Sequence, residues 1–81
     1  MAAQLTLYGR TYCHLCDDMA TALEKLQESL GFAFRVEDVD ADPALEARYG
    51  ELVPVLVDAQ GEEICHYFLD IAALRSRLAV K

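Results

Sequence analysis

Hydrophobic and polar positions alternate along residues 5–8, and this period of two predicts a β-strand with one buried face. From about residue 15 the period lengthens, and apolar side chains recur every three or four residues at Met19, Leu23, Leu26 and Leu30. That spacing predicts a long helix with one apolar stripe. Gly31 is a suitable terminator for it, because glycine readily adopts the left-handed conformation of a helix end.

Alternation returns over residues 32–36 and predicts a second strand. Asp42 and Pro43 then have the character of a helix start, with aspartate as N-cap and proline in the first helical position. This short helix is expected to end near Tyr49 and Gly50. Because a helix separates the first two strands, they are expected to pair in parallel through a right-handed crossover.

The C-terminal third predicts a hairpin and a last helix. The apolar run at residues 53–57 suits a buried strand, with proline tolerated at its start. Residues 58–61 form a turn signal, and residues 62–67 return as an antiparallel partner. Asp70 is a candidate cap for a final helix, in which the residues expected to face inward are Ile71, Leu74 and Leu78.

The predicted element order is therefore β-α-β-α-β-β-α, an α/β fold with a four-stranded mixed sheet flanked by helices on both faces. With 81 residues the chain makes one domain, residues 1–81. A hydrophobic content of 54% supports a packed core.

Charge narrows the range of partners. Fourteen acidic residues against seven basic ones give a net charge of −7, which repels nucleic acid and anionic membrane surfaces. A partner with basic character fits better. The sequence shows neither a leader pattern nor an apolar run long enough to span a membrane, and three cysteines do not suit a secreted disulfide framework. We expect a reduced, cytoplasmic monomer.

The candidate chemistry lies in Cys13-His14-Leu15-Cys16, between the first strand and the long helix. The free N–H groups and partial positive charge of a helix N-terminus favour a thiolate over a thiol. In such Cys-x-x-Cys motifs the pKa of the first thiol falls from about 8.5 to roughly 3.5–7.5. The motif predicts a redox-active dithiol, with Cys13 at the exposed mouth as nucleophile and Cys16 more shielded in the first turn.

Neighbouring side chains allow two interpretations each. Asp17 and Asp18 complement the helix dipole, and their charge raises the pKa of nearby thiols. Arg10 either favours the thiolate or is a solvated loop charge, and His14 either stabilises the thiolate or is an inert surface residue. Tyr12 either lines the groove beside the motif or packs on the sheet edge.

The third cysteine and its neighbours are also open to two interpretations. Cys65 is either a small buried hydrophobe or an additional thiol near the groove. Tyr67 and Phe68 either pack on the core or shape the groove wall.

Two functions compete with the redox hypothesis. One is a metal or iron–sulfur carrier that uses the motif cysteines, although only Cys65, His14 and His66 remain to complete a site. The other is an interaction module whose cysteines are incidental.

At this point the chain resembles the glutaredoxins, and among them the short bacterial glutaredoxin-like proteins. The likeness covers the order of elements and the segments Arg10-Thr11-Tyr12-Cys13-His14-Leu15-Cys16 and Leu52-Val53-Pro54. It implies a thioredoxin-like fold and a thiol–disulfide oxidoreductase that reduces protein or glutathione mixed disulfides. It implies no bound cofactor or metal, with glutathione as a possible co-substrate.

The resemblance also assigns roles. It makes Cys13 the nucleophile and Cys16 the resolving thiol, and it makes the Val53–Pro54 peptide bond cis, with the Val53 backbone facing Cys13. Residues expected to contact the substrate or glutathione are Arg10, Tyr12, His14, Val53, Pro54 and Asp70.

The chain departs from the usual glutaredoxin pattern at two places. His14-Leu15 replaces Pro-Tyr between the cysteines, which changes the redox poise. Residues 64–70 lack the family's glycine pair, so bulkier side chains are expected where the γ-glutamyl end of glutathione would lie.

Overall fold

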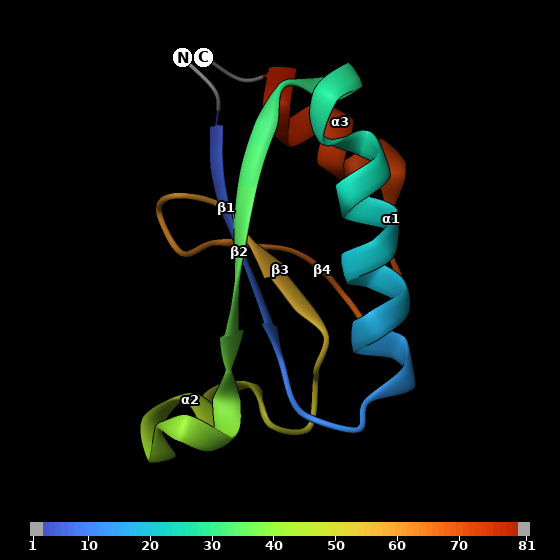
Figure 1. The fold of residues 1–81 in the computed structure, drawn as a ribbon. Coiled ribbons are helices and arrows are strands. Elements are labelled where there is room, and N and C mark those ends of the chain that lie inside the picture. Colours follow the sequence, from blue (N-terminus) through green and yellow to red (C-terminus); the bar gives the residue numbers. More distant parts are fainter. Residues whose placement is uncertain (1–2, 80–81) are drawn as a thin grey trace.

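The computed structural model describes residues 3–79 of the chain. Its strands β1 (Ala3–Gly9), β2 (Phe32–Asp38), β3 (Val55–Val57) and β4 (Glu63–His66) form one sheet in the order β2-β1-β3-β4 (Figure 1). β1 and β2 pair in parallel, whereas β3 is antiparallel to both β1 and β4. The predicted mixed four-stranded sheet is confirmed.

Helices cover both faces of this sheet (Figure 1). The helices α1 (His14–Leu30) and α3 (Ile71–Ala79) lie on one face. The short helix α2 (Pro43–Tyr49) follows a 3-10 turn, η1 (Val39–Ala41), and both pack on the other face. Apart from this added turn, the element order is the predicted one.

Local sequence signals explain where the helices begin and end. Gly31 ends α1 in the left-handed conformation, with φ of 72°, as predicted. The Asp42 side chain accepts a hydrogen bond of 2.9 Å from the Ala44 N–H, and Pro43 occupies the first helical position of α2. Both expected caps are therefore confirmed.

Two apolar clusters form the core. The larger one lies between the sheet and the α1/α3 pair, and its buried members are Leu5, Leu7, Met19, Leu23, Phe32, Leu56, Cys65 and Leu74. The smaller one lies under α2 and η1, where the rings of Tyr8 and Tyr49 stack with centroids 4.4 Å apart. Among residues 3–79, no helix is both long and apolar enough to cross a membrane.

The structure corrects two details. The two C-terminal strands are shorter than the segments 53–57 and 62–67 that the pattern predicted. Ile71 does not face inward, because 44% of it is exposed at the first position of α3. Leu69, just before the helix, packs against the core together with Leu78, and Leu74 is fully buried, so these leucines and not Ile71 attach α3 to the core.

Candidate active site

Cys13 and Cys16 form a disulfide at the junction of β1 and α1, with Cα atoms 5.2 Å apart. Cys13 is the N-cap of α1, and its Sγ accepts a hydrogen bond of 3.2 Å from the Cys16 N–H. Its carbonyl accepts the first helical hydrogen bond, at 3.1 Å, from the Asp17 N–H. The Cys13 sulfur thus lies among the donor groups of a helix N-terminus, where a thiolate is stabilised.

The two sulfurs differ in accessibility. Cys13 is half-buried, whereas only 6% of Cys16 is exposed. Cys16 lies directly against the end of β1, since a Cβ atom added to Gly9 would lie 3.2 Å from the Cys16 Cβ and 3.3 Å from its Sγ. Glycine therefore provides the space for the inner cysteine. The predicted arrangement, with an outer and an inner thiol, is present.

The residues on either side of Cys13 project into solvent. Tyr12 is fully exposed, so the idea that it packs on the sheet edge is wrong. Its backbone has φ of 59°, a left-handed conformation that costs a non-glycine residue about 1–2 kcal/mol. His14, the first residue of α1, is also exposed. The conformation of Tyr12 turns the chain just before Cys13.

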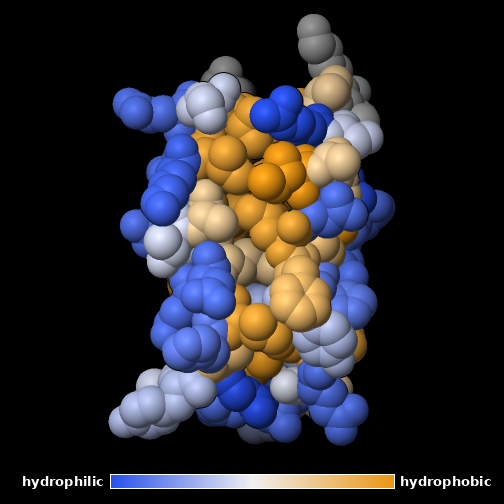
Figure 2. All heavy atoms as spheres, turned by 90° about the vertical axis from the view of Figure 1, so that its right-hand side faces the viewer, coloured by the Kyte–Doolittle hydropathy of each residue, from blue (hydrophilic) through white to orange (hydrophobic). Residues whose placement is uncertain are grey.

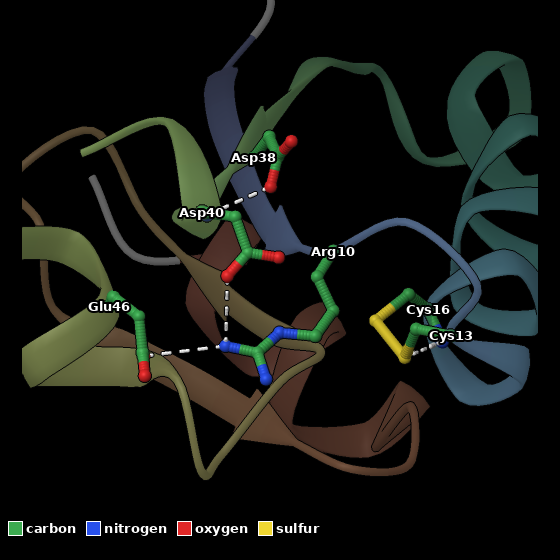
Figure 3. A network of polar contacts seen from close by, with 6 residues as sticks. All are labelled: Arg10, Cys13, Cys16, Asp38, Asp40 and Glu46. Atoms are coloured by element: carbon green, nitrogen blue, oxygen red, sulfur yellow. Dashed lines mark hydrogen bonds and ion pairs between the residues drawn. A yellow bond between two sulfur atoms is a disulfide. The ribbon is translucent and has the colours of Figure 1, made fainter. Parts of the chain in front are cut away.

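Arg10 is engaged in ion pairs directed away from the disulfide (Figure 3). Its Nη2 lies 3.3 Å from Asp40 Oδ1 and 3.3 Å from Glu46 Oε2. The Asp38 side chain accepts a hydrogen bond of 2.9 Å from the Asp40 N–H and so fixes the turn that carries Asp40. Arg10 is thus not a free loop charge, and in the disulfide form its guanidinium serves two carboxylates on η1 and α2.

The Val53–Pro54 peptide bond is cis, as the resemblance implied. The loop that carries it lies at the same end of the sheet as the β1–α1 loop (Figure 1). Tyr67, which follows β4, braces this loop twice: its N–H donates to the Pro54 carbonyl and its hydroxyl donates to the Glu51 carbonyl, each at 2.9 Å. Tyr67 also has a positive φ, 63°.

Asp70 and Cys65 serve the fold. Asp70 caps α3, with its side chain accepting a hydrogen bond of 3.0 Å from the Ala73 N–H. Cys65 is buried in the larger core cluster, which confirms it as a small buried hydrophobe. Burial is the main reason that the pKa of the Cys65 thiol is raised, and the Asp70 and Glu63 charges add to it, while a hydrogen bond from the Asp70 backbone opposes it.

No group of three or more His, Cys, Asp or Glu side chains is arranged to hold a metal ion within residues 3–79. His66, one of the ligands considered from the sequence, has its Nδ1 2.7 Å from Glu63 Oε2.

A small hollow adjoins Leu15 of the cysteine motif, and Tyr67 and Phe68 line it, which is the second of the two roles considered for them from the sequence. The hollow has a volume of about 180 Å³ and is lined by Leu15, Asp18, Met19, Tyr67, Phe68 and Leu69. Phe68 is 69% exposed, so it forms a wall of this hollow and is not a core residue. Leu15, the apolar residue inside the cysteine motif, is exposed and forms another part of the lining, a role that the sequence analysis did not give it.

A cysteine pair at the first strand–helix junction, with a cis-proline loop at the same end of a four-stranded mixed sheet, defines a glutaredoxin-like protein of the thioredoxin fold. The chain belongs to the family described as Glutaredoxin-like domain (DUF836), which it matches over residues 4–79. This fold and this cysteine pair indicate redox function at the general level of an oxidoreductase.

Solved structures agree with this assignment. The solution NMR structure of protein Ne2328 from Nitrosomonas europaea is 36% identical, with a TM-score of 0.88, over 98% of this chain and 94% of that one. The X-ray structure of protein XcR50 from X. campestris is 43% identical, with a TM-score of 0.74, over 91% and 93%. Thioredoxin 1 from Thermosipho africanus, at 17% identity and a TM-score of 0.60 over 90% and 86%, shares the fold. No curated protein matches the chain.

Proposed function

We propose that the protein is a thiol–disulfide oxidoreductase in which Cys13 is the nucleophile and Cys16 the resolving thiol. The observation that carries this proposal is the unequal setting of the two sulfurs. Cys13 is half-buried at the N-terminus of α1, and Cys16 is shielded behind it against Gly9. An attacking thiol needs access to its substrate, and a resolving thiol only needs access to its neighbour.

The reaction begins with both cysteines reduced. The Cys13 thiolate attacks one sulfur of a client disulfide, so that a mixed disulfide forms and the client's other sulfur leaves as a thiolate. Cys16 then loses its proton and attacks Cys13 Sγ. This step forms the Cys13–Cys16 disulfide seen in the structure and releases the client's remaining thiolate. Two electrons pass from the dithiol to the client, and the released thiolates take up protons from water.

A further thiol must return the protein to its reduced form. We assign this role to a thiol reductant such as glutathione in the cytoplasm, with the protein acting as a monomer without a bound cofactor. The Val53 backbone beside Pro54 is proposed to pair with an extended client segment, the mode in which an exposed backbone edge captures a peptide. Tyr12 and His14, both exposed beside Cys13, are proposed to contact that segment.

Trapping the mixed disulfide tests the proposal. Cys16→Ser lacks the resolving thiol, so incubation with a small disulfide-containing peptide should give a stable 1:1 adduct on Cys13, located by mass spectrometry of the digested protein. The matched controls are Cys13→Ser, which should give no adduct, and Cys16→Ser combined with Cys65→Ala, which should give the same adduct. An adduct on Cys65, or none with Cys13 present, would contradict the proposal. A visible-absorbing metal or cluster after anaerobic purification would instead support the carrier function.

A further inference from the structure

The hollow next to Leu15 of the cysteine motif combines an apolar wall with a single charge. Its lining residues are apolar except for the Tyr67 hydroxyl and the Asp18 carboxylate, and Asp18 is exposed. The face of the molecule that includes α1 carries a band of apolar side chains flanked by hydrophilic ones (Figure 2). Leu15, Tyr67 and Phe68 are 36%, 40% and 69% exposed, which is unusual for residues of this size in one place.

The volume of the hollow indicates how large a group it can bind. Sites for whole small molecules typically enclose about 300–1,000 Å³, whereas this hollow has about 180 Å³. It therefore suits one side chain of a larger partner. An apolar wall with a carboxylate at its rim matches lysine or arginine, because these side chains lay an aliphatic stem on apolar surface and keep their charge in water.

The surrounding charge favours the same partner. The start of α1, which lines the hollow, carries Asp17 and Asp18 with no lysine or arginine between residues 14 and 20, and the whole chain has fourteen acidic residues against seven basic ones. The acidic residues of η1 and α2 lie on the other face of the sheet, near Arg10 and Arg48. Arg10 is paired with Asp40 and Glu46, and the Arg48 guanidinium lies 5.1 Å from the centroid of the Tyr49 ring. The acidic excess attracts cationic segments and repels anionic ones.

The Tyr67 side chain and the backbone that carries Phe68 are hydrogen-bonded before any partner binds. Tyr67 is fixed by its hydrogen bonds to the Pro54 and Glu51 carbonyls, and the Phe68 N–H donates to the His66 carbonyl at 2.7 Å. The next residue but one, Asp70, is fixed as the cap of α3. A backbone and a Tyr67 ring fixed in this way lose little conformational entropy when a side chain packs on them.

Building on the proposed function, we propose that the client is a protein whose disulfide lies next to a lysine or arginine. The aliphatic stem of that residue packs on Leu15 and Phe68, and its cationic head pairs with Asp18. The client sulfur is thereby presented to Cys13, two residues before Leu15 in the motif. Because the negatively charged residues of the protein repel anions, anionic glutathione disulfide is a poorer oxidant of this dithiol than a cationic peptide disulfide.

Competition among model peptides tests this proposal. The probes are three disulfide-linked peptides that differ only in one residue beside the cysteine, which is lysine, norleucine or glutamate. The measured quantity is kcat/KM for their reduction by the reduced protein. We expect the order lysine, norleucine, glutamate, and we expect the lysine-to-glutamate ratio to shrink between 50 mM and 500 mM NaCl because exposed charges are screened.

Two charge-neutralising variants locate the effect. Asp18→Asn should lower the lysine-to-glutamate ratio by roughly fivefold, the size of an exposed ion pair. Glu24→Gln makes the same charge change at an exposed position of α1 outside the hollow and should leave the ratio unchanged. Because the ratio compares two peptides on one enzyme, any change in thiol reactivity cancels. Phe68→Ala should weaken reduction of both the lysine and the norleucine peptide.

The outcomes separate this proposal from the proposed function. Equal rates for the three peptides, or a ratio that Asp18→Asn leaves unchanged, would overturn the lysine or arginine site while leaving the oxidoreductase function intact. Failure of the reduced protein to reduce any of the peptides would overturn the oxidoreductase function itself.

Discussion

The motif cysteines and Cys65 place the same side chain in opposite environments. Cys13 caps α1, is half-buried and is bonded to Cys16. Cys65 lies inside β4, opposite Leu56 of β3, and is buried in the larger core cluster. One position offers helix N–H groups and solvent, which favour a thiolate, whereas at the other burial is the main cause that raises the pKa of the thiol. Position in the fold, and not residue type, therefore decides which thiols can do chemistry.

Removing the thiols one at a time should give the largest difference between the two positions. Cys13→Ser should lower disulfide reduction by roughly a thousandfold or more, because it removes the proposed nucleophile of a covalent mechanism. Cys65→Ala should leave the rate within about twofold, since its sulfur only fills space in the core. Steady-state reduction of a peptide disulfide by the two purified variants measures both effects. A large loss of activity in Cys65→Ala, with unchanged circular dichroism, would contradict the comparison.

A smaller effect should appear in the pH dependence of stability. In the folded protein the pKa of the Cys65 thiol is raised above its ordinary value of 9.0. At lower pH this thiol is therefore protonated in the folded and in the unfolded chain alike. As the pH rises above about 9, the unfolded thiol ionises first, so the folded state loses stability until the folded thiol ionises as well. The loss from this one group approaches ~1.4 kcal/mol per pH unit.

Urea unfolding between pH 7 and 11 measures this loss. The protein carries Cys13→Ser and Cys16→Ser, so that Cys65 is its only thiol, and the matched control carries Cys65→Ala in addition. All other titrating groups are shared by the two proteins. Parallel stability curves above pH 9 would show that burial does not hold the Cys65 thiol in its protonated form.

Local signals in the sequence predicted most of the fold. Gly31 and the Asp42-Pro43 pair act through their own backbone preferences, so their roles do not depend on distant residues. The apolar stripe of α1 and the position of the cysteine pair at its start were equally local, and both were predicted.

The features that the sequence did not predict depend on contacts between distant segments. The partners of Arg10 are 30 and 36 residues away, and a charge pattern alone does not select them. The close approach of Gly9 to Cys16 and the bracing of Glu51 by Tyr67 require the packed fold. Ile71 had the spacing of a core residue, yet it is exposed, while Leu69 outside the helix packs against the core.

A redox titration with thiol mapping tests the central claim most directly. The protein is equilibrated with glutathione buffers of different ratios, free thiols are alkylated, and the modified cysteines are located after digestion. The account predicts a single two-electron couple, with a slope of about 30 mV per tenfold change, in which Cys13 and Cys16 oxidise together while Cys65 stays a free thiol throughout. Absence of a reversible Cys13–Cys16 disulfide, or oxidation of Cys65 in its place, would contradict it.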